Sequence, residues 1–401
     1  MNILFLSITR FDNIDTRGIY PDLMREFINR GHDVYIASAL ERRFGKQTYL
    51  VKAKHCQFLN IATLNIRSAG LMEKGISMLM LDRQFDKAIS RYWGDVPFDI
   101  VLYATPPVTF YNAIKHVKER CKCRSYLMLK DIFPQNAVDL GLMKPGGLLY
   151  KVFRKKEKRL YELSDRIGCM SEANVEYVID NNPEIDPANV ELCPNAIQPL
   201  QRDRLSDVER NKILSRYNIP VDKTIFINGG NLGKPQVGEF LFKVLEANES
   251  RADSHIVLIG DGTEFKRVER WFDEHKPSNA TLLSAMPKDE YDEFIRACHV
   301  GMIFLDRRFT IPNFPSRLLT YLENRMPVVV ASDVSTDIGR IAEEGGFGLW
   351  CESGDLETFV RNMTRLSGSA ENIKEMGCRG YDFMVKNYSV DLIADNILNE
   401  K

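Results

Sequence analysis

Residues 228–236 combine glycines and a cation at a spacing that suits phosphate binding. Their sequence is Asn-Gly-Gly-Asn-Leu-Gly-Lys-Pro-Gln, and they lie between an apolar run and an amphipathic one. Glycines let a backbone approach an anion closely, and a lysine adds positive charge. Gly230, Asn231, Gly233 and Lys234 are therefore candidate phosphate-binding residues. A tight turn between a strand and a helix, with no ligand, is the alternative.

A second candidate lies in residues 313–323, where an arginine follows an expected helix start. Pro315 and Ser316 are typical of a helix N-terminus, which puts Arg317 in the first turn. A cation in that position opposes the helix dipole unless an anion offsets it. We therefore expect Ser316 and Arg317 to face a phosphate.

Two further turns are candidates, because each directly follows an apolar run that is expected to form a strand. Arg17 and Gly18 precede a helix that we expect from Ile19, and the free N–H groups of a helix N-terminus suit phosphate. A solvent-exposed loop is the alternative there. Gly260 lies in the sequence Ile-Gly-Asp-Gly, which a simple turn also explains. The first turn lacks the GxGxxG pattern, so a dehydrogenase-type dinucleotide site is not expected.

Strands and helices that could position these segments alternate along the chain. Apolar runs such as residues 2–7, 100–103, 224–228 and 255–259 predict strands, and the amphipathic runs between them predict helices. This alternation is typical of α/β proteins with parallel sheets. A polar stretch over residues 198–223 separates two halves of the pattern.

We expect two doubly wound, Rossmann-like domains, residues 1–198 and 199–383. A C-terminal helix over about 384–401 would pack back on the first domain. Ligands bind beyond the carboxyl ends of the strands in such sheets, so two such domains facing each other would form a cleft.

The composition argues against several classes of protein. The chain has 401 residues, with 54 Lys and Arg against 55 Asp and Glu and a net charge of −1, which is unlike a dedicated nucleic-acid-binding protein. No run approaches the roughly 18 apolar residues of a membrane span. The first residues have the pattern of a buried strand rather than a signal peptide. The eight cysteines lack the spacing of a zinc or redox site, which predicts reduced thiols in the cytoplasm.

Six fragments occur in the order seen in a known family, at residues 18–34, 164–171, 194–196, 229–234, 259–262 and 314–330. Their sequences are GIYPDLMREFINRGHDV, SDRIGCMS, PNA, GGNLGK, IGDG and FPSRLLTYLENRMPVVV. In this order they resemble the retaining nucleotide-sugar glycosyltransferases of family 4, which have the two-domain GT-B fold. Residues 131–141, DIFPQNAVDLG, resemble the branch that makes bacterial surface polysaccharides.

The resemblance implies transfer with retention from a nucleotide-diphosphate sugar, in our expectation a UDP-sugar, to a saccharide or polyprenyl-diphosphate-linked acceptor. In the second domain, Arg317, Lys234 and the backbone of Gly229–Gly233 would stabilise the departing diphosphate, with no metal. In the first, acceptor-side domain, Lys130 and Asp131 follow an expected strand and would be catalytic. Asp131 would assist the attacking hydroxyl, or would only cap the next turn.

This sequence departs from the family at three positions, one of which is Lys130, where many members have a histidine ahead of the acidic residue. The paired glutamates that usually hold the donor ribose fall on Pro312 and Thr320. Thr320 and Glu323 share a helix face at a spacing of three residues, so Glu323 is a candidate substitute. The missing pair keeps open a catalytically inactive nucleotide-sugar-binding protein or partner subunit. A nucleotide-sugar 2-epimerase of the same fold is a further alternative.

A basic segment predicts contact with a membrane surface. Residues 151–159 contain six cations in nine residues. On a helix, Leu149, Val152, Phe153 and Tyr161 would fall broadly on one side with Leu160. Such a helix can lie on anionic lipid, here at the inner face of the plasma membrane. In the alternative, the apolar side packs on the sheet and the cations are solvated.

Overall fold

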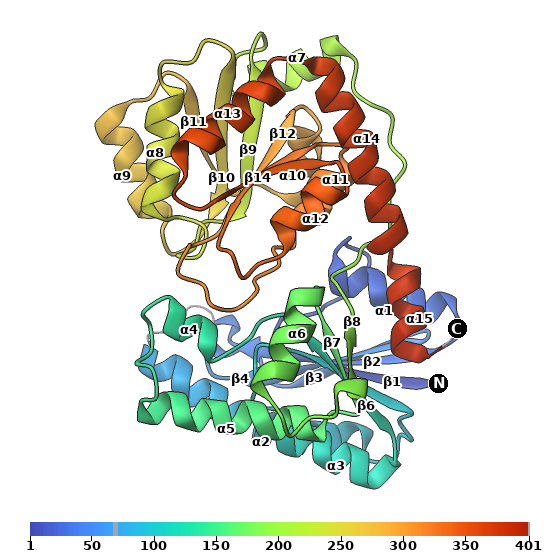
Figure 1. Ribbon diagram of the computed structural model, residues 1–401. Coiled ribbons are helices and arrows are strands. Elements are labelled where there is room, and N and C mark those ends of the chain that lie inside the picture. Colours follow the sequence, from blue (N-terminus) through green and yellow to red (C-terminus); the bar gives the residue numbers. More distant parts are fainter. Residues whose placement is uncertain (67–70, 400–401) are drawn as a thin grey trace. The chain divides into compact units, whose positions relative to one another are not determined.

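The computed structural model describes residues 1–66 and 71–399, and the chain divides into two compact units. One unit contains Met1–Gln198 and the C-terminal residues from Val390 on, and the other contains Pro199–Ser389. Each unit has one sheet with helices on both of its faces (Figure 1). The predicted α/β class with parallel sheets is confirmed.

The N-terminal unit is built on an eight-stranded sheet with the order β3-β4-β2-β1-β5-β6-β7-β8. Neighbouring strands pair in parallel, except that β3 pairs antiparallel with β4 at one edge. The strands are β1 (Asn2–Ser7), β2 (Asp33–Glu41), β3 (Tyr49–Ala53), β4 (Cys56–Thr63), β5 (Ile100–Ala104), β6 (Arg124–Leu129), β7 (Arg166–Cys169) and β8 (Val190–Leu192). The helices are α1 (Ile19–Asn29), α2 (Leu71–Trp93), α3 (Tyr111–Cys121), α4 (Gln135–Asp139), α5 (Leu148–Leu163), α6 (Glu172–Asn181) and α15 (Val390–Leu398).

The C-terminal unit is built on a six-stranded, fully parallel sheet with the order β11-β10-β9-β12-β13-β14. The strands are β9 (Thr224–Asn231), β10 (Ser254–Asp261), β11 (Ala280–Ser284), β12 (Val300–Phe304), β13 (Val328–Ser332) and β14 (Gly348–Glu352). The helices are α7 (Asp207–Arg216), α8 (Glu239–Asn248), α9 (Phe265–His275), α10 (Lys288–Ile295), α11 (Arg317–Glu323), α12 (Ile338–Glu344), α13 (Leu356–Ser367) and α14 (Ala370–Asn387). This strand order is that of a doubly wound, Rossmann-like sheet.

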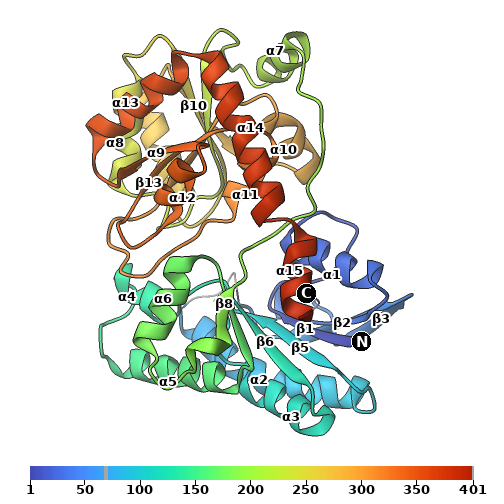
Figure 2. The same cartoon turned by 45° about the vertical axis from the view of Figure 1, so that its right-hand side comes forward.

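The two units have separate apolar cores. In the N-terminal unit, α1 and α15 pack together on one face of the sheet, where Phe5, Phe27 and Ile397 share a core. In the C-terminal unit, α8 and α13 cover one face, and α11 contacts α14 (Figure 2). The C-terminal helix expected over about 384–401 is interrupted, because α14 ends at Asn387 and α15 starts at Val390.

The central strands β9 and β12 diverge toward their carboxyl ends. β9 pairs with β10 along its whole length, but its pairing with β12 is restricted to Phe226 and Ile227. The order of the chain reverses between these two strands, and open α/β sheets bind ligands beyond such a reversal. The carboxyl end of β9 is therefore where we look for the functional site.

Some elements differ from the sequence prediction. β9 extends to Asn231, beyond the predicted end at Asn228, because Gly229, Gly230 and Asn231 continue to pair with β10. The strands β3, β4, β8 and β14 have no counterpart among the predicted runs; β8 has three residues and β3 is an exposed edge strand. No helix in the described part of the chain is both long and apolar enough to cross a membrane.

Candidate functional site

Two neighbouring glycines at the carboxyl end of β9 differ in exposure. Gly230 is exposed, has φ +107°, and has no atom within 4 Å of the position that a Cβ would take. A side chain is strained at such a φ, and the open space leaves the backbone accessible to a ligand. Gly229 is buried, and a Cβ there would collide with the hydroxyl of Tyr291 on α10.

The second glycine turn supports the first. Gly260 is buried at φ +146°, and a Cβ there would collide with the carbonyl oxygen of Gly230. The backbone N–H of Leu232 donates to the carbonyl of Asp261 at 2.6 Å, and that of Glu264 donates to the carbonyl of Leu232 at 3.0 Å. Gly260 therefore lies against the segment after β9 and holds it in place.

Arg317 is directed to the same place from the first turn of α11. Its guanidinium donates to the side-chain oxygen of Asn228 and, at 3.0 Å, to the backbone carbonyl of Asn231. Both oxygens are neutral, so they do not supply the negative charge that was expected to offset the charge of Arg317. Among the described residues, no carboxylate forms an ion pair with Arg317. The half-buried guanidinium thus lies near the exposed backbone of Gly230 with no carboxylate of the described residues to offset its charge.

Tyr321, Tyr291 and Asn228 support this arrangement, and the sequence analysis did not identify them. The Tyr321 hydroxyl accepts from the N–H of Gly229 at 3.0 Å and lies 3.2 Å from the Ile227 carbonyl. It also lies 3.3 Å from the carbonyl of Met302 on β12, and it therefore bridges strands β9 and β12 where they diverge. Burial raises the pKa of both tyrosines, so both are neutral at pH 7. The spacing of four residues between Arg317 and Tyr321 on a helix was the available signal.

The other residues of the C-terminal unit that were predicted to bind the nucleotide-sugar donor have fewer side-chain contacts than Arg317. Lys234 is exposed, and it makes no hydrogen bond or ion pair with the residues that the structure describes. Ser316 is exposed too, and its side chain does not cap α11. Gly233 is buried and accepts hydrogen bonds from the N–H groups of Gln236 and Val237. Thr320 is half-buried on α11.

Glu323 does not belong to this site. Its carboxylate accepts from the backbone N–H of Leu200 at 3.1 Å and lines a cavity with His299, which directly precedes β12. Six residues of helix advance by about 9 Å, so Glu323 lies at the opposite end of α11 from Arg317. This position argues against Glu323 as a substitute for a ribose-binding glutamate, and that role stays a prediction.

In the N-terminal unit, Asp131 lies directly beyond the end of β6. The side-chain amide of Asn136 donates to its carboxylate at 2.6 Å. Burial raises the pKa of Asp131 to about 6, and hydrogen bonds from Asn136 and the backbone of Ile132 oppose that shift. The hydroxyl of Thr105, at the end of β5, donates to the Asp131 carbonyl at 3.1 Å. Asp131 is thus a half-buried carboxylate that is ionised in most molecules at pH 7.

Lys130 is held away from Asp131. Its ammonium group donates to the backbone carbonyl of Cys193 at 3.1 Å, at the turn after β8. Burial lowers the pKa of Lys130. The predicted catalytic role is not supported by this geometry, because the ammonium group is bound to a backbone carbonyl. We regard Lys130 as a positioning residue that joins the ends of β6 and β8.

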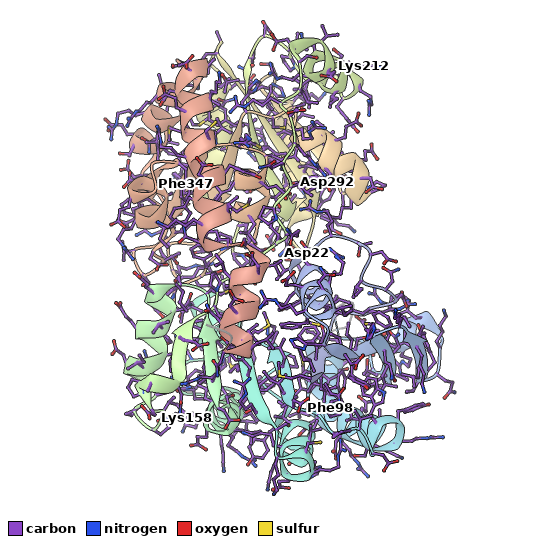
Figure 3. The ribbon with its side chains drawn as sticks, turned by 90° about the vertical axis from the view of Figure 1, so that its right-hand side faces the viewer. Asp22, Phe98, Lys158, Lys212, Asp292 and Phe347 are labelled. Carbon is purple, nitrogen blue, oxygen red and sulfur yellow. The ribbon has the colours of Figure 1, made fainter. Side chains whose placement is uncertain are left out.

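The start of α1 already holds an anion of the protein itself. The carboxylate of Asp22, labelled in Figure 3, accepts from the N–H of Gly18 at 3.0 Å and from that of Gln198 at 2.9 Å. Arg17 donates to the carbonyl of Gln198 at 3.0 Å. Asp22 is 2% exposed, and its carboxylate occupies the helix N-terminus while it pairs with Arg25. A side chain of the protein thus already binds the free N–H group at this helix start, which argues against donor phosphate there; the phosphate-binding role of Arg17 and Gly18 stays a prediction.

The described residues contain no group of three or more His, Cys, Asp and Glu side chains that could hold a metal ion. All eight cysteines are free thiols.

Two Rossmann-like units in one chain define the GT-B architecture of glycosyltransferases. The crystal structure of Anabaena Alr3699/HepE in complex with UDP has this fold, with a TM-score of 0.67 and 12% sequence identity. The alignment covers 100% of this chain and 99% of that one.

Residues 209–383, which lie in the C-terminal unit, match the family model described as Glycosyl transferases group 1. Probable glycosyltransferase WbjE of Pseudomonas aeruginosa is 23% identical over 270 residues, which are 66% of this chain and 64% of the relative. Putative colanic acid biosynthesis glycosyl transferase WcaI of Escherichia coli K12 is 19% identical over 267 residues, 65% of this chain and 64% of the relative. The matched region is less than two thirds of the length of either curated relative.

Proposed function

We propose that this protein is a retaining glycosyltransferase of family 4 that uses a UDP-sugar and a saccharide or polyprenyl-diphosphate-linked acceptor in the synthesis of a bacterial surface polysaccharide. The observation that carries the proposal is the guanidinium of Arg317, which no carboxylate of the described residues neutralises, beside the open backbone of Gly230. The region that matches the group 1 family model contains both residues. UDP is bound by the similar Anabaena protein, and WcaI is named for colanic acid synthesis.

The proposed role of Arg317 is to stabilise the leaving diphosphate. Negative charge grows on that group as the bond to the sugar breaks, so cations and N–H groups already in place lower the barrier. Arg317 is held by Asn228 and Asn231 before any ligand arrives. Lys234 extends freely from the glycine segment and supplies a second charge. We propose that these residues act without a metal, so a chelator leaves the transfer rate unchanged.

The proposed role of Asp131 is on the acceptor side, in the N-terminal unit. An ionised carboxylate accepts a hydrogen bond from the attacking hydroxyl and takes up its proton as the new bond forms. The raised pKa of Asp131, about 6, is closer to neutrality than that of an ordinary carboxyl, which makes it a better base.

A donor screen followed by product analysis tests this function. The full chain is incubated with UDP-, GDP- and dTDP-sugars, and thermal shifts identify the donor. Transfer to saccharide acceptors is then followed, and NMR of the product reports its anomeric configuration. We expect a UDP-sugar to stabilise the chain and the product to retain the donor configuration. An inverted product refutes retention, and donor binding with no transfer to any acceptor indicates an inactive binding protein.

We also propose that helix α5 brings the N-terminal unit into contact with anionic lipid. The surface involved differs from the single apolar side that the sequence predicted. Phe153, Leu160 and Tyr161 are buried, whereas Leu149 and Val152 are 56% and 40% exposed, so the apolar residues do not form one side. Two leucines, Leu142 in the preceding loop and Leu148 at the start of α5, add to this exposed apolar end, and Lys144 in the same loop is exposed as well.

Some cations of α5 form ion pairs within the protein, whereas others are exposed and unpaired among the described residues. Arg154 pairs with the buried Glu157 at 2.6 Å, and Lys158, labelled in Figure 3, pairs with Glu184 at 2.8 Å. Lys151 and Lys155 are exposed and form no ion pair with any described residue. The proposed lipid-binding surface therefore consists of the exposed apolar end of α5 with Lys144, Lys151 and Lys155.

Co-sedimentation with vesicles tests this surface. Binding to phosphatidylglycerol-containing vesicles should fall as salt rises, and should be lost in Lys151→Glu/Lys155→Glu. Charge reversal at two exposed cations elsewhere in the chain, Lys266→Glu/Arg270→Glu, is the matched control and should bind normally. Equal binding by both variants, or no binding at low salt, contradicts the proposal.

A further inference from the structure

A cavity lies at the edge of the C-terminal unit opposite the glycine segment. Its volume is about 610 Å³, including the solvent at its mouth. Among its lining residues, His299 directly precedes β12 and Met326 lies just before β13, so it is at the amino ends of these strands. The extended segment of residues 199–206 that leads into α7 forms one wall, and it runs beside α10 and α14 (Figure 2).

The lining is strongly basic. Arg202 and Arg204 come from the extended segment, Arg210 from α7, Arg296 from the end of α10 and Arg325 from the turn after α11. Two carboxylates line the cavity as well, those of Asp203 and Glu323. Glu323 already accepts a hydrogen bond from the backbone of Leu200.

Of the five guanidinium groups, the one on Arg210 pairs with a carboxylate of a described residue, Asp207 at 2.7 Å. Arg296 donates to the backbone carbonyl of Asp203 at 2.9 Å, and Arg204 donates to that of Lys374 at 3.3 Å.

Arg325 stacks over the ring of Tyr381, with 4.0 Å between the guanidinium carbon and the ring centroid. Arg202 makes no hydrogen bond or ion pair with the residues described. Four of the arginines are therefore held by neutral groups or by none.

Acidic residues on neighbouring helices reduce this charge without removing it. Hydrogen bonds from Ser206 and then the charge of Arg296 lower the pKa of Glu209. A hydrogen bond from Arg216 and the charges of Arg216, Lys212 and Arg296 lower the pKa of Glu293. Like charges that line one cavity repel one another, and more strongly where the dielectric constant is lower than that of water. An anion in the cavity would relieve that repulsion.

His299 adds a neutral donor to the lining. Its Nδ1 accepts the backbone N–H of Ile225 at 2.9 Å, so the proton of the neutral ring is on Nε2. Burial, and then the charge of Arg210, lower its pKa to about 4, so the ring is neutral at pH 7. The cavity thus combines fork-shaped cationic donors with an imidazole N–H, a donor set that suits phosphate oxygens.

We propose that this cavity binds a small phosphate-bearing anion, of the class of a diphosphate or a sugar phosphate, which joins the segment of residues 199–206 to the body of the C-terminal unit. Arg202 and Arg204 would contact the anion from the segment, and Arg296 and Arg325 from the opposite wall. The site is distinct from the carboxyl end of β9, because the two lie at opposite ends of α11.

Pyrophosphate binding to the full chain tests the proposal. Calorimetry uses the Arg317→Ala background, so that binding at the glycine segment does not contribute. We expect one pyrophosphate per chain, an affinity that falls with salt, and slower hydrogen exchange in residues 199–206. Arg202→Gln/Arg296→Gln in that background should weaken binding at least tenfold, and Arg270→Gln/Arg361→Gln, which changes two exposed arginines of the same unit, should not. Single Arg202→Gln breaks no hydrogen bond or ion pair with the described residues, so it should fold normally and still weaken binding.

Absence of binding in the Arg317→Ala chain, or equal binding by the cavity and control variants, overturns the proposal. The outcome is separable from that of the proposed function. If pyrophosphate binds here and UDP does not bind the unmodified chain, the donor site is refuted and this one remains.

Discussion

At the residue scale, the central feature of the candidate site is a guanidinium held by uncharged oxygens. Asn228 and Asn231 fix the position of Arg317 without neutralising it. A carboxylate in their place would hold the side chain equally well but would repel a diphosphate. An arginine bound in this way is preorganised for an anion, because little side-chain freedom remains to be lost on binding.

Arg317→Ala should weaken UDP binding by about 10- to 100-fold, since hydrogen bonds to charged groups contribute roughly 1.5–3 kcal/mol. Binding of uridine, which has no phosphate, should change little. Calorimetry with both ligands measures the difference, and Arg361→Ala on α13 is the control. Equal losses for UDP and uridine would show that Arg317 supports the fold of the site instead of the diphosphate.

Asp131 allows a prediction from its raised pKa. Its folded-state pKa, about 6, lies above the ordinary value of 3.8, so the folded chain binds this proton more tightly than the unfolded chain. The ionised carboxylate therefore costs stability, and the cost develops as pH rises from about 4 to about 6. Asp131→Asn should be more stable than the unmodified chain at pH 7, by about 1–3 kcal/mol. Denaturant unfolding at pH 4 and pH 7 measures this.

The same variant should lose transfer activity by roughly 10²- to 10⁴-fold, the usual range for a general base. The rise of the rate with pH through about 6 should also disappear. A more stable but inactive Asp131→Asn protein distinguishes a base from a residue that only caps the next turn. If transfer and acceptor affinity are both unchanged, Asp131 only caps the next turn.

At the scale of elements, the carboxyl end of β9 depends on how two glycine turns and one short helix meet. Gly260 fits against the Gly230 carbonyl, and Tyr321 fits its hydroxyl between β9 and β12 while its ring lies over Gly301. A Cβ on Gly301 would collide with that ring. The seven-residue helix α11 thus serves the site through Arg317 and Tyr321 at the same time.

Gly260→Ala should displace the glycine segment, because its Cβ would collide with the Gly230 carbonyl and its φ of +146° is strained for alanine. We expect a loss of about 1–3 kcal/mol in stability and weaker UDP binding. Gly238→Ala is the matched control, since its φ is −94° and nothing lies within 4 Å of a Cβ there. Thermal unfolding and UDP titration of both variants check the prediction, and similar behaviour of the two would contradict it.

At the scale of the whole molecule, two sheets with separate cores imply that a ligand of one unit stabilises that unit. UDP at 100 times its dissociation constant should raise the stability of the C-terminal unit by about 2.7 kcal/mol. Hydrogen exchange in β9 and β12 should slow accordingly, with less effect in β1 and β5. Arg317→Ala, with its affinity for UDP lowered about 10- to 100-fold, should reduce this stabilisation to about 0.4–1.4 kcal/mol at the same UDP concentration. Slower exchange confined to β1 and β5 would show that UDP binds the N-terminal unit and would contradict this prediction.

The sequence by itself determined the class of fold and most of the candidate site. Apolar runs, amphipathic runs and glycines are local features, and they were sufficient to predict the alternating elements, the glycine segment and the position of Arg317 in the first turn of a helix. Short or polar strands such as β3 and β8 lack a long apolar run and escaped prediction.

Only the tertiary structure decided which groups meet. Arg317 lies 89 residues from Asn228, and the strand order brings them together. Helical spacing showed that Glu323 shares a face with Thr320, but not that it lies at the far end of the sheet beside Leu200. Likewise, Asp22 occupies the start of α1 by contacts that include Gln198, 176 residues away. The physical reason is common to all three cases. Sequence periodicity specifies the side of an element, whereas sheet order and packing decide its neighbours and which end of an element meets the ligand.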